Sequence, residues 1–165
     1  MEAFLKELPG LAKEKYLETK KYFEKMKKRT PKNLDVVMQE LHNKEFKKTD
    51  CLTCGNCCKT TSPIFTEKDI SRISKYLRIK EAMFISQYLE RDKDDFYVLI
   101  TAPCSFLDLN DNMCTIYDVR PKACNEYPHT NRRKFIQLTS LTLKNTEVCP
   151  AVYNIVEELK RKLPL

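Results

Sequence analysis

The stretch Cys51-Leu-Thr-Cys54-Gly-Asn-Cys57-Cys58 places four thiols within eight residues. Two cysteines separated by two residues can turn their sulfur atoms toward one centre, because the loop between them curls back. Gly55 directly follows the second cysteine, where a positive φ is often needed and glycine adopts it at no steric cost. Neighbouring side chains tend to diverge, so Cys57 and Cys58 are expected to face different centres. The stretch predicts a metal-binding loop.

The rest of the chain adds four single cysteines to this cluster. The 165 residues contain eight cysteines, and the other four are Cys104, Cys114, Cys124 and Cys149. The N-terminus is charged and does not resemble a secretory signal, so we expect a cytoplasmic location, where structural disulfides are rare. Buried thiols that act only as small apolar side chains are the alternative. We expect all eight cysteines to be metal ligands instead.

The spacing leaves two classes of metal open. Zinc takes four ligands, commonly from two C-x2-C pairs, but only the first cluster offers such pairs. Three cysteines in C-x2-C-x2-C resemble an iron–sulfur loop, whose fourth thiolate lies elsewhere and is often followed by proline, as in Cys149-Pro150. An iron–sulfur cluster is therefore slightly preferred over Zn²⁺.

The eight thiols divide into two expected sets of four. The first set comprises Cys51, Cys54, Cys57 and Cys149. The second set comprises Cys58, Cys104, Cys114 and Cys124, and the turn residues at 108–112 would bring two of these together across a hairpin. Whether one or both centres form is left open by the sequence.

The later cysteines lie in a specific frame, Cys114-Thr-Ile-Tyr117-Asp-Val-Arg120-Pro121-Lys-Ala-Cys124-Asn-Glu-Tyr-Pro128. With the opening cluster and Cys149-Pro150, this frame resembles the CxxCxxCC, or YkgJ-like, family over about residues 51–150. The resemblance implies a zinc- or iron-chelating domain. A related cysteine cluster accompanies lysine methylation of flagellin in some bacteria, which suggests an iron–sulfur centre and a protein-modifying relative. A metal-binding module could itself have a structural, redox or sensing role.

Tyr117 and Arg120 are candidates to support the ligands from outside the coordination sphere. Arg120 has five donors that could reach backbone carbonyls or a thiolate, or it could simply shape the turn before Cys124. The sequence contains no Ser/His/Asp set and no H-E-x-x-H motif, so no catalytic residue is assigned and no independent catalytic activity is expected.

The remaining pattern predicts a mainly α protein with a small β-hairpin. Apolar spacing indicates helices over 3–28, 33–47, 66–77, 80–89 and 150–163, and a strand over 96–100. The segment 132–144 is ambiguous between helix and strand. We expect two domains: a lysine-rich helical hairpin or arm over 1–50, and a compact cysteine-cluster domain with a C-terminal helix over 51–165.

Basic residues are concentrated near the N-terminus. Residues 13–32 carry nine basic and three acidic side chains, which accounts for most of the formal net charge of +7. A solvated surface is the simplest interpretation, and the alternative function is a zinc-stabilised adaptor whose lysine-rich helices bind an anionic partner. That partner could be an acidic protein of unknown identity or a nucleic acid such as RNA, although no nucleic-acid-binding motif supports the latter. The sequence contains no apolar run of about 18 residues, the length that would indicate a membrane span.

Overall fold

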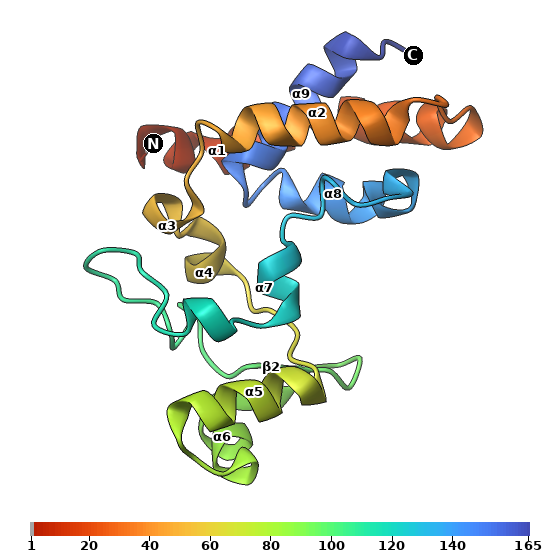
Figure 1. Ribbon diagram of the computed structural model, residues 1–165. Coiled ribbons are helices and arrows are strands. Elements are labelled where there is room, and N and C mark those ends of the chain that lie inside the picture. Colours follow the sequence, from red (N-terminus) through yellow and green to blue (C-terminus); the bar gives the residue numbers. More distant parts are fainter. Residues whose placement is uncertain (1) are drawn as a thin grey trace. The chain divides into compact units, whose positions relative to one another are not determined.

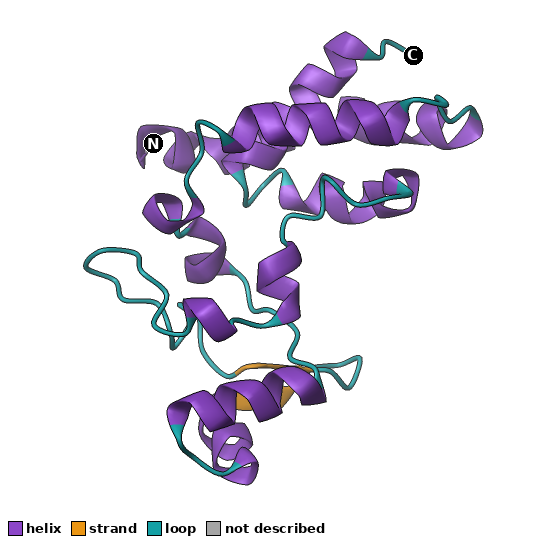
Figure 2. Ribbon diagram, viewed as in Figure 1, coloured by secondary structure: helices purple, strands orange, loops and turns teal. Residues whose placement is uncertain are grey.

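The computed structural model describes residues 2–165, and helices make up most of it (Figure 1). Within these residues, strands are confined to one two-stranded antiparallel hairpin, drawn in orange in Figure 2. The expected mainly α fold with a small hairpin is confirmed. The chain divides into two units, residues 2–50 with Pro128–Leu165 and Cys51–Tyr127. The C-terminal segment thus groups with the N-terminal helices, whereas the sequence analysis placed it with the cysteines.

The first unit is built from helices alone among its described residues. They are α1 (Glu2–Lys28), α2 (Leu34–Phe46), the 3-10 turn η2 (Phe135–Leu138), α8 (Thr139–Asn145) and α9 (Pro150–Lys162). Both α1 and α2 pack against α9. The predicted bounds of these three helices agree with the structure to within one or two residues, and the ambiguous segment 132–144 is helical from Phe135 onward.

Local chemistry explains how the helices of this unit begin and join. Pro150 occupies the first turn of α9, where its missing N–H has no helical partner to lose. The Tyr22 hydroxyl of α1 donates a 2.8 Å hydrogen bond to the carbonyl of Leu163, at the end of α9. The carboxylate of Asp35 accepts hydrogen bonds from the backbone N–H groups of Lys134 and Phe135, which fixes the start of η2.

The second unit contains the short elements and the hairpin. Its elements are α3 (Cys51–Cys54), α4 (Asn56–Thr60), α5 (Glu67–Leu77), α6 (Glu81–Tyr88), β1 (Leu89–Arg91), β2 (Tyr97–Leu99), η1 (Tyr117–Val119) and α7 (Lys122–Glu126). The strand register pairs Leu89 with Leu99 and Arg91 with Tyr97. The predicted strand is confirmed, but its partner was missed, because Leu89 continued the apolar spacing of the preceding helix.

A hydrophobic cluster lies between α5, α6 and the hairpin. Its buried members are Phe65, Ile70, Ile73, Phe84, Leu89, Leu99, Phe106 and Ile116. The fully buried Phe84 is central, since its ring centroid lies 6.1 Å from those of both Phe65 and Phe106. Burying one such side chain contributes about 1.5–3 kcal/mol. This part of the unit therefore has an apolar core, against which Cys104 and Cys114 pack from its edge.

Candidate metal centre

The first four cysteines lie on two short helices joined by Gly55. Cys51 and Cys54 lie on α3, and the predicted positive φ of Gly55 is confirmed at 57°. A Cβ atom at Gly55 would lie 3.1 Å from the Cβ of Asn112. The side-chain amide of Asn112 also donates to the carbonyl of Thr53 at 3.2 Å. The loop 108–113 is therefore in close contact with the turn that separates the two helices.

Cys57 and Cys58 follow on α4, and their thiols are hydrogen-bonded to each other. The assignment of the two thiols to different centres stays a prediction. The hydrogen bond from Cys57 lowers the pKa of Cys58 to about 7, although burial opposes it, and the charge of Lys59 lowers it further.

Cys104 and Cys114 approach each other across a loop, as the turn residues between them predicted. Leu107 and Cys114 form an antiparallel bridge, and Asp108 N donates to the carbonyl of Met113 at 2.8 Å. The backbone N–H of Cys104 donates to the carbonyl of Cys58 at 2.8 Å. One backbone hydrogen bond thus connects the loop directly to α4.

Backbone N–H groups point at the thiols of both loop cysteines. In each case the donor is two residues further along the chain: Phe106 for Cys104 and Ile116 for Cys114. Burial nevertheless raises the pKa of both thiols, that of Cys104 to about 11. N–H groups directed at sulfur reduce the charge of a thiolate and are typical of the surroundings of metal-bound cysteine.

Cys124 lies on α7 and shares the electrostatic environment of the other three thiols. Burial is the main cause that raises its pKa to about 12, and Cys58, Cys104 and Cys114 raise it further. Cys58 and Cys114 also raise the pKa of Cys104. Thiols from four separate segments are therefore close enough to influence one another's ionisation.

The structure does not assign ligands beyond this proximity. Among residues 2–165, no three His, Cys, Asp or Glu side chains form a ready-made group that could hold an ion. Cys149 is the residue before α9 and belongs to the other unit. Its grouping with Cys51, Cys54 and Cys57 therefore stays a prediction, as does the role of all eight cysteines as ligands.

Arg120 and Tyr117 form a stacked pair beside these thiols. The guanidinium carbon of Arg120 lies 3.9 Å from the centroid of the Tyr117 ring. Its nitrogens donate to the carbonyl of Tyr117 at 2.6 Å and to the side chain of Asn125 at 2.8 Å. The charge of Arg120 also lowers the pKa of Cys114 and Cys124 against the effect of burial. Arg120 thus shapes the turn and also favours the thiolate form of the two cysteines.

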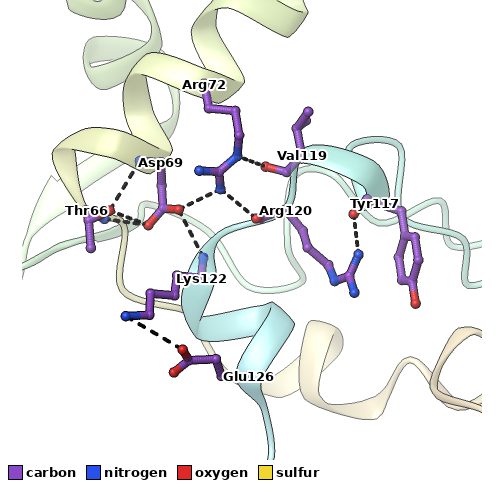
Figure 3. Close-up of polar contacts among 8 residues, drawn as sticks. All are labelled: Thr66, Asp69, Arg72, Tyr117, Val119, Arg120, Lys122 and Glu126. Carbon is purple, nitrogen blue, oxygen red and sulfur yellow. Dashed lines mark hydrogen bonds and ion pairs between the residues drawn. The ribbon is translucent and has the colours of Figure 1, made fainter.

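A buried carboxylate beside this turn was not recognised as part of the site from the sequence. Figure 3 shows Asp69 between Thr66 on one side and Arg72 and Lys122 on the other. Its side chain is 1% exposed. The sequence indicated a helix start at Thr66, and the structure has a capping box there between Thr66 and Asp69. No sequence signal indicates that the same carboxylate also contacts Lys122.

The comparisons with known proteins concern the cysteine-bearing part of the chain. Residues 50–150, more than half of the chain, match the CxxCxxCC family, described as a "putative zinc- or iron-chelating domain". The chain belongs to this family. The CxxCxxCC match spans every cysteine of the chain.

One relative is the uncharacterized protein MJ0661 of Methanocaldococcus jannaschii, which is 32% identical over 87 residues. The aligned region covers 48% of this chain and 44% of that protein. The chain thus matches less than half the length of this relative. No solved structure matches the chain significantly. None of the helices found in residues 2–165 is both long and apolar enough to cross a membrane.

Proposed function

We propose that this CxxCxxCC protein binds a metal centre through the thiolates of Cys58, Cys104, Cys114 and Cys124. The observation that carries the proposal is the convergence of the segments that bear these thiols. The backbone N–H of Cys104 donates to the carbonyl of Cys58, Leu107 pairs with Cys114, and these three thiols raise the pKa of Cys124. Soft thiolate ligands suit zinc and iron–sulfur clusters and are poorly matched to calcium or magnesium. The donor set therefore fits the zinc- or iron-chelating description of the family.

Binding would remove protons from these thiols. Cys58, with a pKa of about 7, is partly ionised at neutral pH and would bind first. Cys104 and Cys124, with pKa values of about 11 and 12, keep their protons until a metal displaces them. Because the metal competes with protons, its apparent affinity should rise with pH. The positive charge of Arg120 would partly offset the charge of about −2 on a four-thiolate zinc or [4Fe–4S]²⁺ centre.

Cys51, Cys54, Cys57 and Cys149 make up the second set of this proposal, which rests on their spacing alone. Three thiols at C-x2-C-x2-C with a distant Cys-Pro favour an iron–sulfur cluster there. With a redox-active cluster the protein would transfer electrons, sense redox state or assist a protein-modification reaction. With zinc in both sets its role would be structural.

Metal analysis of the full chain after anaerobic purification tests this function. We expect bound iron with absorption near 400 nm, or colourless protein with stoichiometric zinc. Cys114→Ser should lose one metal centre, because serine oxygen is a poor ligand for soft metals. Thr115→Ser is a matched control, since serine can keep the hydrogen bond to the carbonyl of Phe106. Metal-free protein under these conditions, or full metal content in Cys114→Ser, would contradict the proposal.

An adaptor function is the second candidate, favoured by one face of α1. Lys6, Lys13 and Lys20 are exposed and lie seven residues apart, which places them near one line along the helix. Leu17, which is 67% exposed, lies close to that line. Such a face suits an acidic protein segment.

Binding of polyglutamate tests this adaptor function. Polyglutamate should bind the chain in a salt-sensitive way. The double variant Lys13→Gln with Lys20→Gln should abolish this binding, while Lys68→Gln in α5 should have no effect. Equal binding by all variants would exclude this face.

A further inference from the structure

We propose that Asp69 is a positioning residue for the thiolate site, because its carboxylate fixes the start of the helix that carries Cys124. The inference rests on the function proposed above and adds residues outside the cysteine motif. It assigns Asp69 and Arg72 the task of placing Cys124 relative to Cys58, Cys104 and Cys114.

The two oxygens of Asp69 have separate partners. Oδ2 accepts hydrogen bonds from the backbone N–H of Thr66 at 2.9 Å and from its hydroxyl at 2.6 Å, which completes the capping box of α5. Oδ1 accepts from the backbone N–H of Lys122 at 3.0 Å. Lys122 is the first residue of α7, and the residue before it, Pro121, gives that helix no side-chain cap. One carboxylate therefore caps the N-termini of two helices.

Arg72 extends this contact to the turn that precedes α7. Its Nη2 atom donates to Oδ1 of Asp69 at 2.6 Å and to the carbonyl of Arg120 at 2.8 Å. Its Nε atom donates to the carbonyl of Val119 at 3.3 Å. Three backbone groups on both sides of Pro121 are thus fixed by the Asp69–Arg72 pair (Figure 3).

The position of Cys124 depends on these contacts because α7 is too short to order itself. It has five residues, whereas isolated helices shorter than about 12–15 residues are marginal in water. Cys124 lies in its first turn, two residues after the N–H that Asp69 accepts. The preceding turn also carries Arg120, whose charge acts on the thiols of Cys114 and Cys124. A displaced turn would therefore move the thiol of Cys124. It would also move the positive charge that acts on Cys114 and Cys124.

Titration of the metal-free, reduced full chain with Co²⁺ tests this role, since Co²⁺ reports its thiolate geometry by absorption. Asp69→Asn keeps the size of the side chain but replaces one oxygen acceptor with an amide donor. Arg72→Gln removes the guanidinium from a side chain that is already 42% exposed. Loss of such supporting contacts typically weakens metal binding about 10- to 100-fold. We expect a loss of that size in both variants, with an altered Co²⁺–thiolate spectrum.

Ile73→Val is the matched control. Ile73 is fully buried on the same helix, and its apolar side chain cannot form a hydrogen bond with Asp69 or Arg72. It should bind Co²⁺ with the wild-type affinity and spectrum. If Asp69→Asn does not fold, Arg72→Gln decides the question alone. Wild-type affinity and spectrum in Arg72→Gln would overturn the positioning role while the proposed function stands. If the wild-type chain gives no Co²⁺–thiolate absorption, the proposed function itself fails, and this inference fails with it.

Discussion

Two parts of the unit Cys51–Tyr127 are stabilised by different forces. The part formed by α5, α6 and the hairpin packs around Phe84 and has a buried apolar core. The part that carries the cysteines, residues 51–61 and 101–127, consists of short helices and loops joined by polar contacts, and its Phe106 and Ile116 extend into that core. Hydrophobic burial needs no ligand, whereas clustered thiols gain most of their stabilisation when a metal replaces their protons. We therefore expect the first part to remain folded without metal.

The largest effect should come from metal removal. Structural zinc contributes roughly 10–16 kcal/mol in zinc-finger peptides. Hydrogen exchange measured by mass spectrometry should show lost protection in α3, α4 and α7, while α5 and α6 stay protected. Reloading the metal should restore protection, which separates its removal from irreversible oxidation. Equal loss of protection in α5 and α6 would mean that the apolar core does not stay folded without the metal.

Phe84→Ala should destabilise the part formed by α5, α6 and the hairpin. Phe84 is fully buried, and truncating such a phenylalanine typically costs about 3–5 kcal/mol. Urea denaturation of the metal-free chain would measure the loss in free energy of unfolding. Met83→Ala is the matched control. Met83 precedes Phe84 in the chain and is 48% exposed, so truncating it should cost less than about 0.5 kcal/mol. A similar small cost for both variants would remove the basis for the comparison.

Gly55→Ala should cause a smaller, local loss in the cysteine part. The φ of 57° costs an alanine about 1–2 kcal/mol, and its Cβ would lie 3.1 Å from that of Asn112. Gly10→Ala is the same substitution within α1, where a Cβ meets nothing within 4 Å. There alanine should stabilise the helix by about 0.5–1 kcal/mol. Thermal unfolding compares the two, and a gain in stability from Gly55→Ala would contradict the argument.

The smallest expected effect is a dependence on pH in the stability contributed by Asp69. Burial alone would raise the pKa of Asp69, but hydrogen bonds from Thr66, Arg72 and Lys122 outweigh it and lower the pKa below its ordinary value. A lowered folded-state pKa stabilises the fold above the unfolded-state value of about 3.9, and this contribution is lost as the pH falls through the folded-state pKa.

The destabilisation caused by Asp69→Asn should therefore be complete near neutral pH and should shrink below about pH 4. Urea midpoints of the metal-free wild type and variant, compared across this range, measure it. Asp92→Asn is a control, since Asp92 also accepts backbone hydrogen bonds, from Asp94 and Phe96 in the hairpin loop, but lies outside the Asp69 contacts. A difference between wild type and Asp69→Asn that stays constant down to pH 2 would contradict the argument.

Local signals predicted most of the helices and several details of the candidate site. Apolar spacing is a local property, so α1, α2, α5 and α9 could be located to within one or two residues. Turn residues at 108–112 indicated that the chain folds back between Cys104 and Cys114. The bridge between Leu107 and Cys114 and the backbone hydrogen bond from Asp108 to Met113 form that turn. The strand β1 was missed because its three residues pair with a partner that propensity alone does not reveal.

The sequence by itself determined which side chains are available as donors: eight thiols in a family-specific frame, with a glycine where the chain must adopt a positive φ. Only the tertiary structure brought Cys58 and Cys124 into one electrostatic environment and gave Asp69 a second helix to cap. The reason is physical. Ligand type and backbone preference belong to single residues, whereas a shared pKa environment or a contact between Asp69 and Lys122 exists only after distant segments have packed together.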